Sequence, residues 1–175
     1  MKKRIRNAAA VAVAALVLTG CGTSLLEEGT ACLEQGDYVA AADTFMEAVQ
    51  KDSEDSEAWR GLGLARWEQK DYGGALEAFR NVLEKEGDPT GELYNLMGNC
   101  SMELEDTKGA LQYYGLGLKS EDISEELKQE MRWNEIAAYE KAGDVDHAKE
   151  KLDSYMQDYP DDEKAAKEAE FLKTR

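Results

Sequence analysis

The stretch that decides the fold of this 175-residue chain is Trp59–Leu83, WRGLGLARWEQKDYGGALEAFRNVL. Apolar and small residues recur with helical spacing on both sides of the segment 71–74, DYGG, which has the composition of a tight turn. Gly63 marks the first predicted helix, and Ala75 and Phe79 mark the second. The stretch therefore predicts two helices joined by a short turn.

The same pattern occurs three more times along the chain. An alanine opens each predicted second helix, at successive spacings of 34, 35 and 38 residues. An aspartate stands four residues before each alanine, and a large side chain stands four residues after it. A small residue lets two helix backbones approach where they cross, and the large one fills the space beside the crossing. The alanines are Ala41, Ala75, Ala110 and Ala148; the aspartates are Asp37, Asp71, Asp106 and Asp144; the large residues are Phe45, Phe79, Tyr114 and Leu152; and the first helices carry Gly29, Gly63, Gly98 and, in the fourth unit, Ile136.

A helix-turn-helix unit that recurs about every 34 residues resembles the tetratricopeptide repeat. The resemblance covers roughly Thr23 to Pro160 and is best in the second unit. It implies an all-α fold, a right-handed α-solenoid of about four repeats, since each helix pair must stack on its neighbours to complete a core. We expect the array to span 24–160, with repeats at about 22–55, 56–89, 91–124 and 129–162, an inserted segment 120–130 that lengthens the next helix to about 124–142, and a C-terminal capping helix within 161–175.

The N-terminus has the features of a targeting segment. Four basic residues precede an apolar run of 11 residues, 8–18, which is shorter than the ~20 residues that span a bilayer as a helix. Residues 1–20 are therefore predicted to be a secretory signal peptide. The sequence Leu18-Thr19-Gly20-Cys21 resembles the bacterial lipobox, which implies cleavage before Cys21 and a diacylglycerol on its thiol. The alternative is an ordinary cleaved signal followed by an incidental cysteine.

The lipobox resemblance predicts where the mature protein resides. Residues 21–23 would form the acylated cysteine and a short tether. The expected location is the extracytoplasmic face of a bacterial cell membrane, with the lipid as the only membrane contact. The type of bacterial envelope is left open.

The chain is strongly acidic, with 37 acidic and 21 basic residues and a net charge of −16. Loss of the four basic residues in 1–20 would leave 17 basic residues and a net charge of −20. Such a surface repels nucleic acid, so no nucleic-acid partner is predicted. Acidity could favour basic partners, but many of the acids stand where helices begin, where they suit the helix dipole and cap free amides.

Residues with catalytic potential are sparse. The sole histidine, His147, has no companion set for a metal site or a catalytic triad. The run 61–63, GLG, lies inside a predicted helix, where it serves packing and does not form a phosphate loop. Cys32 and Cys100 belong to repeats that are not adjacent, so they are expected to be small buried hydrophobes. The sequence predicts no catalytic residue, no metal and no cofactor, and hence no enzyme.

The family resemblance places the first helix of each pair along a concave groove. Trp67 and Trp133 exceed the packing needs of the repeat, so they either face that groove or pack against neighbouring helices or the C-terminal helix. Asparagine amides and an indole ring suit an extended or helical peptide. The candidate groove residues are Arg60, Leu64, Trp67, Glu68, Asn95, Asn99, Met102, Trp133 and Asn134, flanked by Leu33, Glu34, Glu103 and Ala137.

The expected function is that of a non-catalytic adaptor or scaffold in the bacterial cell envelope. Its partner would be an unidentified protein or peptide. The alternative is a self-associating structural component of an envelope assembly with no separate ligand. The oligomeric state is left open.

Overall fold

The computed structural model describes residues 24–121 and 123–174, and every regular element in those ranges is an α-helix. The expected signal peptide and Cys21 lie outside the described residues. The helices are α1 (Leu25–Glu34), α2 (Tyr38–Lys51), α3 (Ser56–Glu68), α4 (Tyr72–Glu84), α5 (Gly91–Glu103), α6 (Thr107–Gly117), α7 (Glu125–Lys141), α8 (Val145–Asp158) and α9 (Glu163–Leu172). Four helix pairs and a terminal helix follow one another, which confirms the predicted α-solenoid.

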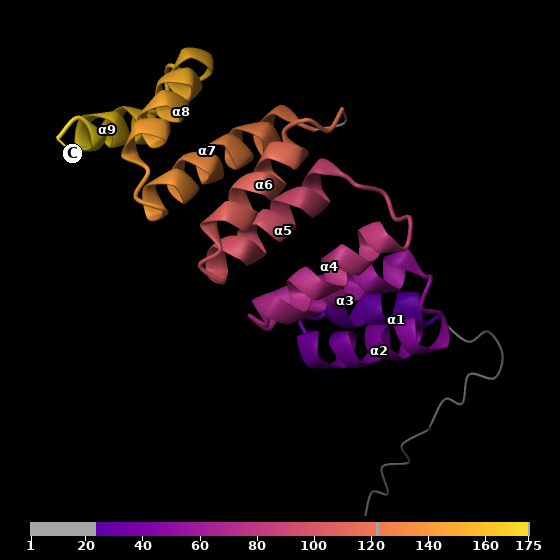
Figure 1. Ribbon diagram of the computed structural model, residues 1–175. Helices are drawn as coiled ribbons and strands as arrows, with labels where there is room; N and C mark the ends of the chain where they lie inside the picture. Colours follow the sequence, from indigo (N-terminus) through magenta and orange to yellow (C-terminus); the bar gives the residue numbers. More distant parts are fainter. Residues whose placement is uncertain (1–23, 122, 175) are drawn as a thin grey trace, which may run out of the picture.

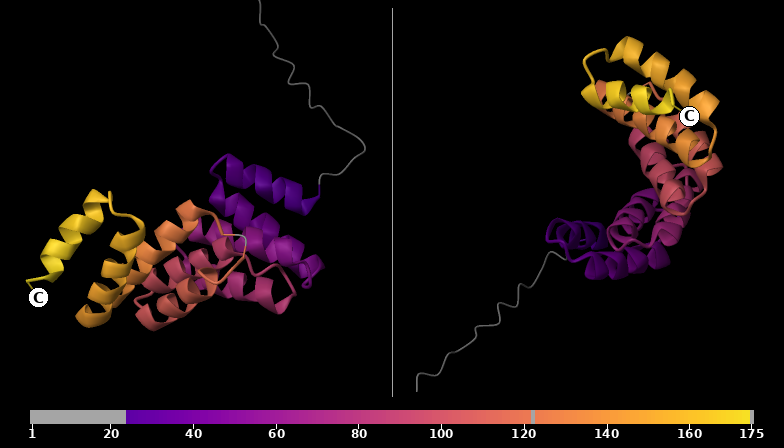
Figure 2. Two further views of the ribbon diagram at one scale, coloured as in Figure 1. Left: turned by 90° about the horizontal axis from the view of Figure 1, so that it is seen from above. Right: turned by 90° about the vertical axis from the view of Figure 1, so that its left-hand side faces the viewer.

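The helix pairs stack in a row that runs from α1–α2 to α7–α8, with α9 at the far end (Figure 1). Each helix packs against the next one in the chain, and the stronger contacts between non-consecutive helices join α1 to α3 and α5 to α7. At these two junctions the first helices therefore lie closer together than the second helices do. As a result the row bends into a crescent, which the right-hand view of Figure 2 shows.

The repeated aspartates begin the second helix of every pair. Each is the N-cap residue, and its carboxylate accepts a hydrogen bond from the backbone N–H three residues on, at 2.9 to 3.3 Å. An N-cap carboxylate satisfies one of the free amides of the first helical turn and suits the helix dipole there. This capping explains why the aspartate recurs with the alanine. The four caps are Asp37, Asp71, Asp106 and Asp144.

The residue before each aspartate adopts a left-handed backbone conformation that closes the turn. Gly36 and Gly143 occupy this position in the outer repeats, with φ of 75° and 76°. Lys70 and Glu105 occupy it in the inner repeats, with φ of 62° and 61°. A left-handed conformation costs an L-residue roughly 1–2 kcal/mol but costs glycine nothing. The two inner turns are therefore under backbone strain.

Replacing Lys70 by glycine should stabilise the protein. Relief of the left-handed strain outweighs the larger unfolded-state entropy of glycine, so we expect a gain of about 0.5–1 kcal/mol in the free energy of unfolding. The measurement is urea denaturation followed by circular dichroism. Gly36→Ala, which introduces the same strain into the first turn, should move stability in the opposite direction. An unchanged or lowered stability of Lys70→Gly would contradict the turn geometry.

The crossing of each pair is packed as the repeat predicts. The four alanines are fully buried, and Phe45, Phe79, Tyr114 and Leu152 are at most 2% exposed. In the first three pairs a glycine of the first helix faces the ring of the second. A Cβ atom added at Gly29, Gly63 or Gly98 would come under 3.0 Å from the carbons of Phe45, Phe79 and Tyr114 respectively. Only hydrogen fits at these crossings.

The last repeat differs from the others as the sequence predicts. Helix α7 has 17 residues, with Ser124 as its N-cap and Ala142 as its C-cap, in agreement with the expected range 124–142. Helix α9 covers the end of α8, and its buried Ala165 and Leu172 join a cluster that includes Leu152. The solenoid therefore ends on a helix whose apolar side is covered.

Both cysteines of the array are free thiols. Cys100 is fully buried, and burial raises the pKa of its thiol to about 12. Cys32 is only half-buried, and it packs against the first core cluster. The expected burial is therefore confirmed for Cys100 and only partial for Cys32, which lies on α1, the first helix of the described array.

Candidate binding groove

Three first helices, α3, α5 and α7, meet at a recess of about 370 Å³. One residue of α6 completes its wall. The residues that line the recess are Trp67 of α3, Asn99, Met102 and Glu103 of α5, Tyr114 of α6, and Glu130, Asn134 and Ala137 of α7. No residue of α9 lies among them, so the terminal helix does not fill this part of the groove.

Two asparagines in the recess are held by hydrogen bonds. The Oδ1 atom of Asn99 accepts from the Tyr114 hydroxyl at 2.7 Å and from Nδ2 of Asn134 at 3.2 Å. Burial, together with nearby Glu130, raises the pKa of Tyr114, so its hydroxyl stays protonated and remains a donor. The amides of α5 and α7 are thereby pre-oriented toward each other. Fixed amides suit the recognition of a peptide backbone, which offers alternating donors and acceptors.

Trp67 has both of the roles that the sequence left open. The ring is half-buried, packs edge-on against Tyr72 with centroids 5.0 Å apart, and contacts the second core cluster. It also lines the recess. An indole that is anchored on one side and accessible on the other offers apolar area at little entropic cost.

The structure gathers four of the nine candidate residues in this recess: Trp67, Asn99, Met102 and Asn134. Glu68 is exposed at the end of α3. Arg60 and Leu64 line a second recess of about 340 Å³ between α1 and α3. There the Arg60 guanidinium donates to the Asp88 carbonyl at 3.2 Å, so its position is fixed by the loop after α4.

Two candidates, Asn95 and Trp133, do not line the recess. Asn95 is only 6% exposed, because α7 covers it and its Nδ2 donates to Glu130 at 2.9 Å. Trp133 packs edge-on against Tyr155, with centroids 5.6 Å apart, in the cluster formed with α8 and α9. The packing interpretation therefore holds for Trp133.

Tyr114 is the recess residue that the sequence assigned only to the core. Its ring is 1% exposed, as predicted, but its hydroxyl reaches Asn99. The sequence did indicate a polar role for Tyr114. The equivalent residue is phenylalanine in the first two repeats, and a buried tyrosine hydroxyl requires a hydrogen-bond partner.

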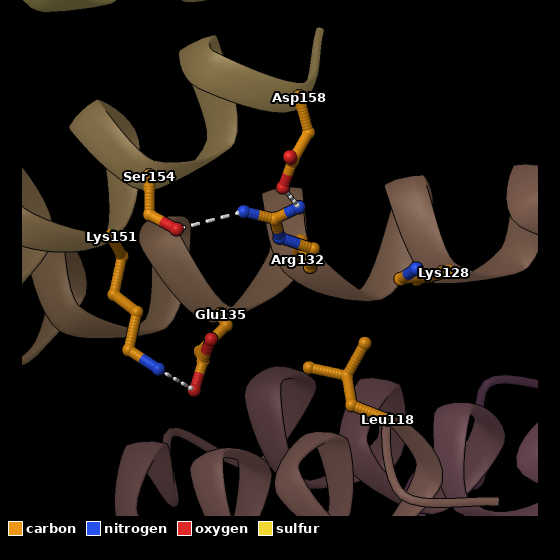
Figure 3. A pocket seen from close by; sticks show the side chains of 7 residues that line it. All are labelled: Leu118, Lys128, Arg132, Glu135, Lys151, Ser154 and Asp158. Carbon is orange, nitrogen blue, oxygen red and sulfur yellow. Dashed lines mark hydrogen bonds and ion pairs between the residues drawn. The ribbon is translucent and has the colours of Figure 1, made fainter.

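A further recess, of about 360 Å³, lies between α7, α8 and the end of α6 (Figure 3). Its charged groups are largely paired within the chain. Arg132 forms an ion pair with Asp158 and donates to the Ser154 hydroxyl at 3.1 Å, while Lys151 lies 2.8 Å from Glu135. These bonds join α7 to α8, which is a structural role.

His147 lies on the surface of the fourth repeat. Its ring stacks on Tyr139, with centroids 5.3 Å apart, and its Nδ1 lies 2.7 Å from the Asp144 carboxylate. Within residues 24–121 and 123–174, no group of three histidine, cysteine, aspartate or glutamate residues is placed to hold a metal ion. No helix in those ranges is long and apolar enough to cross a membrane.

The His147–Asp144 pair predicts a pH dependence. The hydrogen bond and charge of Asp144 raise the pKa of His147 above 6.5, and the same pair lowers the pKa of Asp144 below 3.8. The stabilisation linked to His147 is complete below pH 6.5 and is lost as the pH rises through its raised pKa. The stabilisation linked to Asp144 is complete above pH 3.8 and is lost as the pH falls through the lowered pKa of Asp144.

An NMR titration of the imidazole checks this assignment. We expect a His147 pKa above 6.5 that returns toward 6.5 in Asp144→Asn, where the N-cap is kept and the charge is removed. An identical pKa in both proteins would show that the ion pair does not form in solution.

The fold and the recess define a class: a curved array of helical repeats with an accessible groove. Two tetratricopeptide repeat models match the chain, one at residues 4–56, 26–92 and 60–122 and the other at residues 136–162. The chain therefore belongs to the tetratricopeptide repeat family. Members of this family are generally non-catalytic interaction modules, so the fold indicates a protein-binding or scaffold role.

Solved structures of other repeat proteins have the same fold. YrrB, described as a TPR protein with an unusual peptide-binding site, is 20% identical, with a TM-score of 0.72 over 85% of this chain and 74% of that one. MamA 41-end from Desulfovibrio magneticus RS-1 is 17% identical, with a TM-score of 0.73 over 86% and 82%. A tetratricopeptide repeat protein from Parabacteroides merdae ATCC 43184 is 17% identical, with a TM-score of 0.67 over 85% and 56%. No curated protein sequence matches the chain.

Proposed function

We propose that this protein is a non-catalytic adaptor that binds a segment of a partner protein in the recess between α3, α5 and α7. The observation that carries the proposal is the convergence of Trp67, Asn99 and Asn134, from three successive repeats, on one recess that the chain's own α9 leaves open. Such a site offers an apolar anchor beside fixed amide groups, the combination that favours binding of a peptide segment.

The similarity to YrrB is consistent with this proposal. That protein is described as having a peptide-binding site, and its fold matches this one over most of both chains. The charged recess between α7 and α8 does not compete as a binding site, because its main charges are satisfied internally.

Crosslinking and affinity capture from the native cell envelope test the adaptor function. The test variant is Trp67→Ala with Asn134→Ala, which removes the anchor and one amide of the recess. The matched control is Trp133→Ala, which removes an indole outside the recess. A partner captured by the wild type and the control but lost from the test variant would support the proposal, provided that circular dichroism finds the variants folded.

Two results would count against it. Equal capture by all three proteins would place the binding surface elsewhere. Capture of only the protein itself, with concentration-dependent oligomers in ultracentrifugation, would favour the self-associating structural component.

We further propose that a lipid on Cys21 holds the adaptor at the extracytoplasmic face of a bacterial membrane. Support comes from the sequence Leu18-Thr19-Gly20-Cys21 after a short apolar run, and from the position of α1, whose N-cap is Ser24. Two acyl chains give a stable anchor, whereas one alone does not. A short tether would hold the first repeat close to the bilayer.

Cys21→Ala tests the anchor. The wild type should sediment with membranes and the variant should be released, since the attachment is covalent. Retention of the variant on membranes in high salt would overturn the lipoprotein assignment, and Cys32→Ala serves as the control for loss of a thiol.

A further inference from the structure

The ionisable side chains that line the recess, apart from Tyr114, are two carboxylates, Glu103 and Glu130. Both are exposed, and neither forms an ion pair with any residue in the described ranges. Ionised carboxylates can accept hydrogen bonds but cannot donate them, so these two groups present negative charge that no direct ion pair neutralises.

Helix stability does not explain the acids that end three of the first helices, one of which is Glu103 of the recess. Glu34, Glu68 and Glu103 are the last residues of α1, α3 and α5, at equivalent positions of three repeats, and all are exposed. A carboxylate at a helix C-terminus faces the negative end of the helix dipole and is unfavourable there. Acids at the N-terminal ends of helices in this chain act as caps, but Glu34, Glu68 and Glu103 at the C-terminal ends do not.

The fourth repeat places a cation at the same position. Lys141 ends α7, and its ammonium donates to the carbonyl of Met102, at the rim of the recess, at 2.8 Å. The chain thus sets one of its own ammonium groups where the end of α5 presents carbonyl oxygens. The rim accommodates a positive charge.

The groups around the Glu130 carboxylate also favour a hydrogen-bond donor in the recess. Asn95 is 94% buried and its Nδ2 donates to the Glu130 carboxylate at 2.9 Å, which positions that carboxylate. Its Oδ1 has no hydrogen-bond partner among the described residues. Burial chiefly, and then the nearby charge of Glu130, raises the pKa of the Tyr114 hydroxyl, which therefore stays a donor. An unpaired acceptor thus lies behind the recess, next to its Glu130 wall.

We propose that this recess receives a lysine or arginine side chain of the bound segment, with its cationic head against Glu103 and Glu130. The apolar stem of that side chain would lie along Trp67 and Met102, because long basic side chains cover apolar surface while their charge is paired. Charge-assisted hydrogen bonds to two carboxylates would supply both affinity and selectivity. This inference rests on the proposed adaptor function and specifies the chemistry of its partner.

Selection from a display library of random short peptides tests the inference with a defined probe. The bait is the folded array, and recovered sequences are compared with those recovered on Glu103→Gln with Glu130→Gln. The matched control is Glu150→Gln with Glu170→Gln, which removes two exposed charges on α8 and α9, outside the recess. Individual peptides are then measured by fluorescence polarisation at low and at physiological salt.

Enrichment of lysine or arginine in the selected peptides is expected. Their affinity should fall by about tenfold or more in the recess double variant, as loss of charge-assisted hydrogen bonds predicts, and by less than about twofold in the control. Equal losses in both variants would show a non-specific charge effect and overturn the inference. Peptides that lack basic residues, lose binding on Trp67→Ala, and are insensitive to the glutamates would overturn it while the adaptor function stands. Recovery of no peptide would count against both.

Discussion

Phe79→Ala should lower the free energy of unfolding by about 3–5 kcal/mol, the range measured when buried phenylalanines are truncated to alanine. The ring is fully buried, faces Gly63 within its own helix pair, and belongs to the cluster that joins α4 to α5. Its removal empties a space that the surrounding helices cannot refill without breaking the stacking of the second and third repeats.

Chemical denaturation of the two proteins measures this loss. Phe171→Ala is the matched control, since that ring is 47% exposed on the terminal helix and its truncation should cost less than about 1 kcal/mol. A loss below about 1 kcal/mol for Phe79→Ala would mean that the crossing of α3 and α4 is not packed as described.

Gly61→Ala should destabilise the protein although alanine is the better helix former. A Cβ atom at Gly61 would come under 3.0 Å from the Phe45 ring, which already has Gly29 against it. The ring cannot move away freely, so the added methyl overpacks the contact between the first two repeats and should cost about 1–3 kcal/mol.

Gly115→Ala is the comparison variant, because it adds the same methyl group to a helix without overpacking. Gly115 is also helical, on α6, but an added Cβ would meet nothing within 4 Å. There the helix propensity of alanine prevails, and the free energy of unfolding should rise by up to about 1 kcal/mol. The two thermal midpoints should therefore move in opposite directions, and movement in the same direction would contradict the packing at Gly61.

The packing variants at Phe79 and Gly61 and the recess variant at Glu103 should affect folding and binding separately. Changes at Phe79 and Gly61 act on the crossings between helices, whereas Glu103 is exposed and makes no ion pair with any described residue. A variant such as Glu103→Gln should therefore change peptide affinity while leaving the thermal midpoint nearly unchanged. Loss of binding together with loss of the fold would say nothing about the recess.

The sequence by itself determined the features that depend on neighbours within one helix pair. The caps Asp37 and Asp71 act on amides three residues away, and Gly63 and Phe79 meet across a single turn. Such contacts recur at fixed spacings, because every repeat packs its two helices in the same way. The helix pairs and their turns could therefore be predicted from spacing, and the long α7 from the helix-start sequence at 124–127.

Only the tertiary structure decided which side chains share the recess. Asn95 and Asn99 lie one turn apart on α5, yet α7 covers the first through Glu130, 35 residues away in the chain, and leaves the second to line the groove. The Tyr114 hydroxyl reaches into the recess, and Trp133 turns toward α8 instead. These outcomes depend on the angle between successive repeats. That angle is set by packing among side chains that are far apart in sequence, and no local pattern records it.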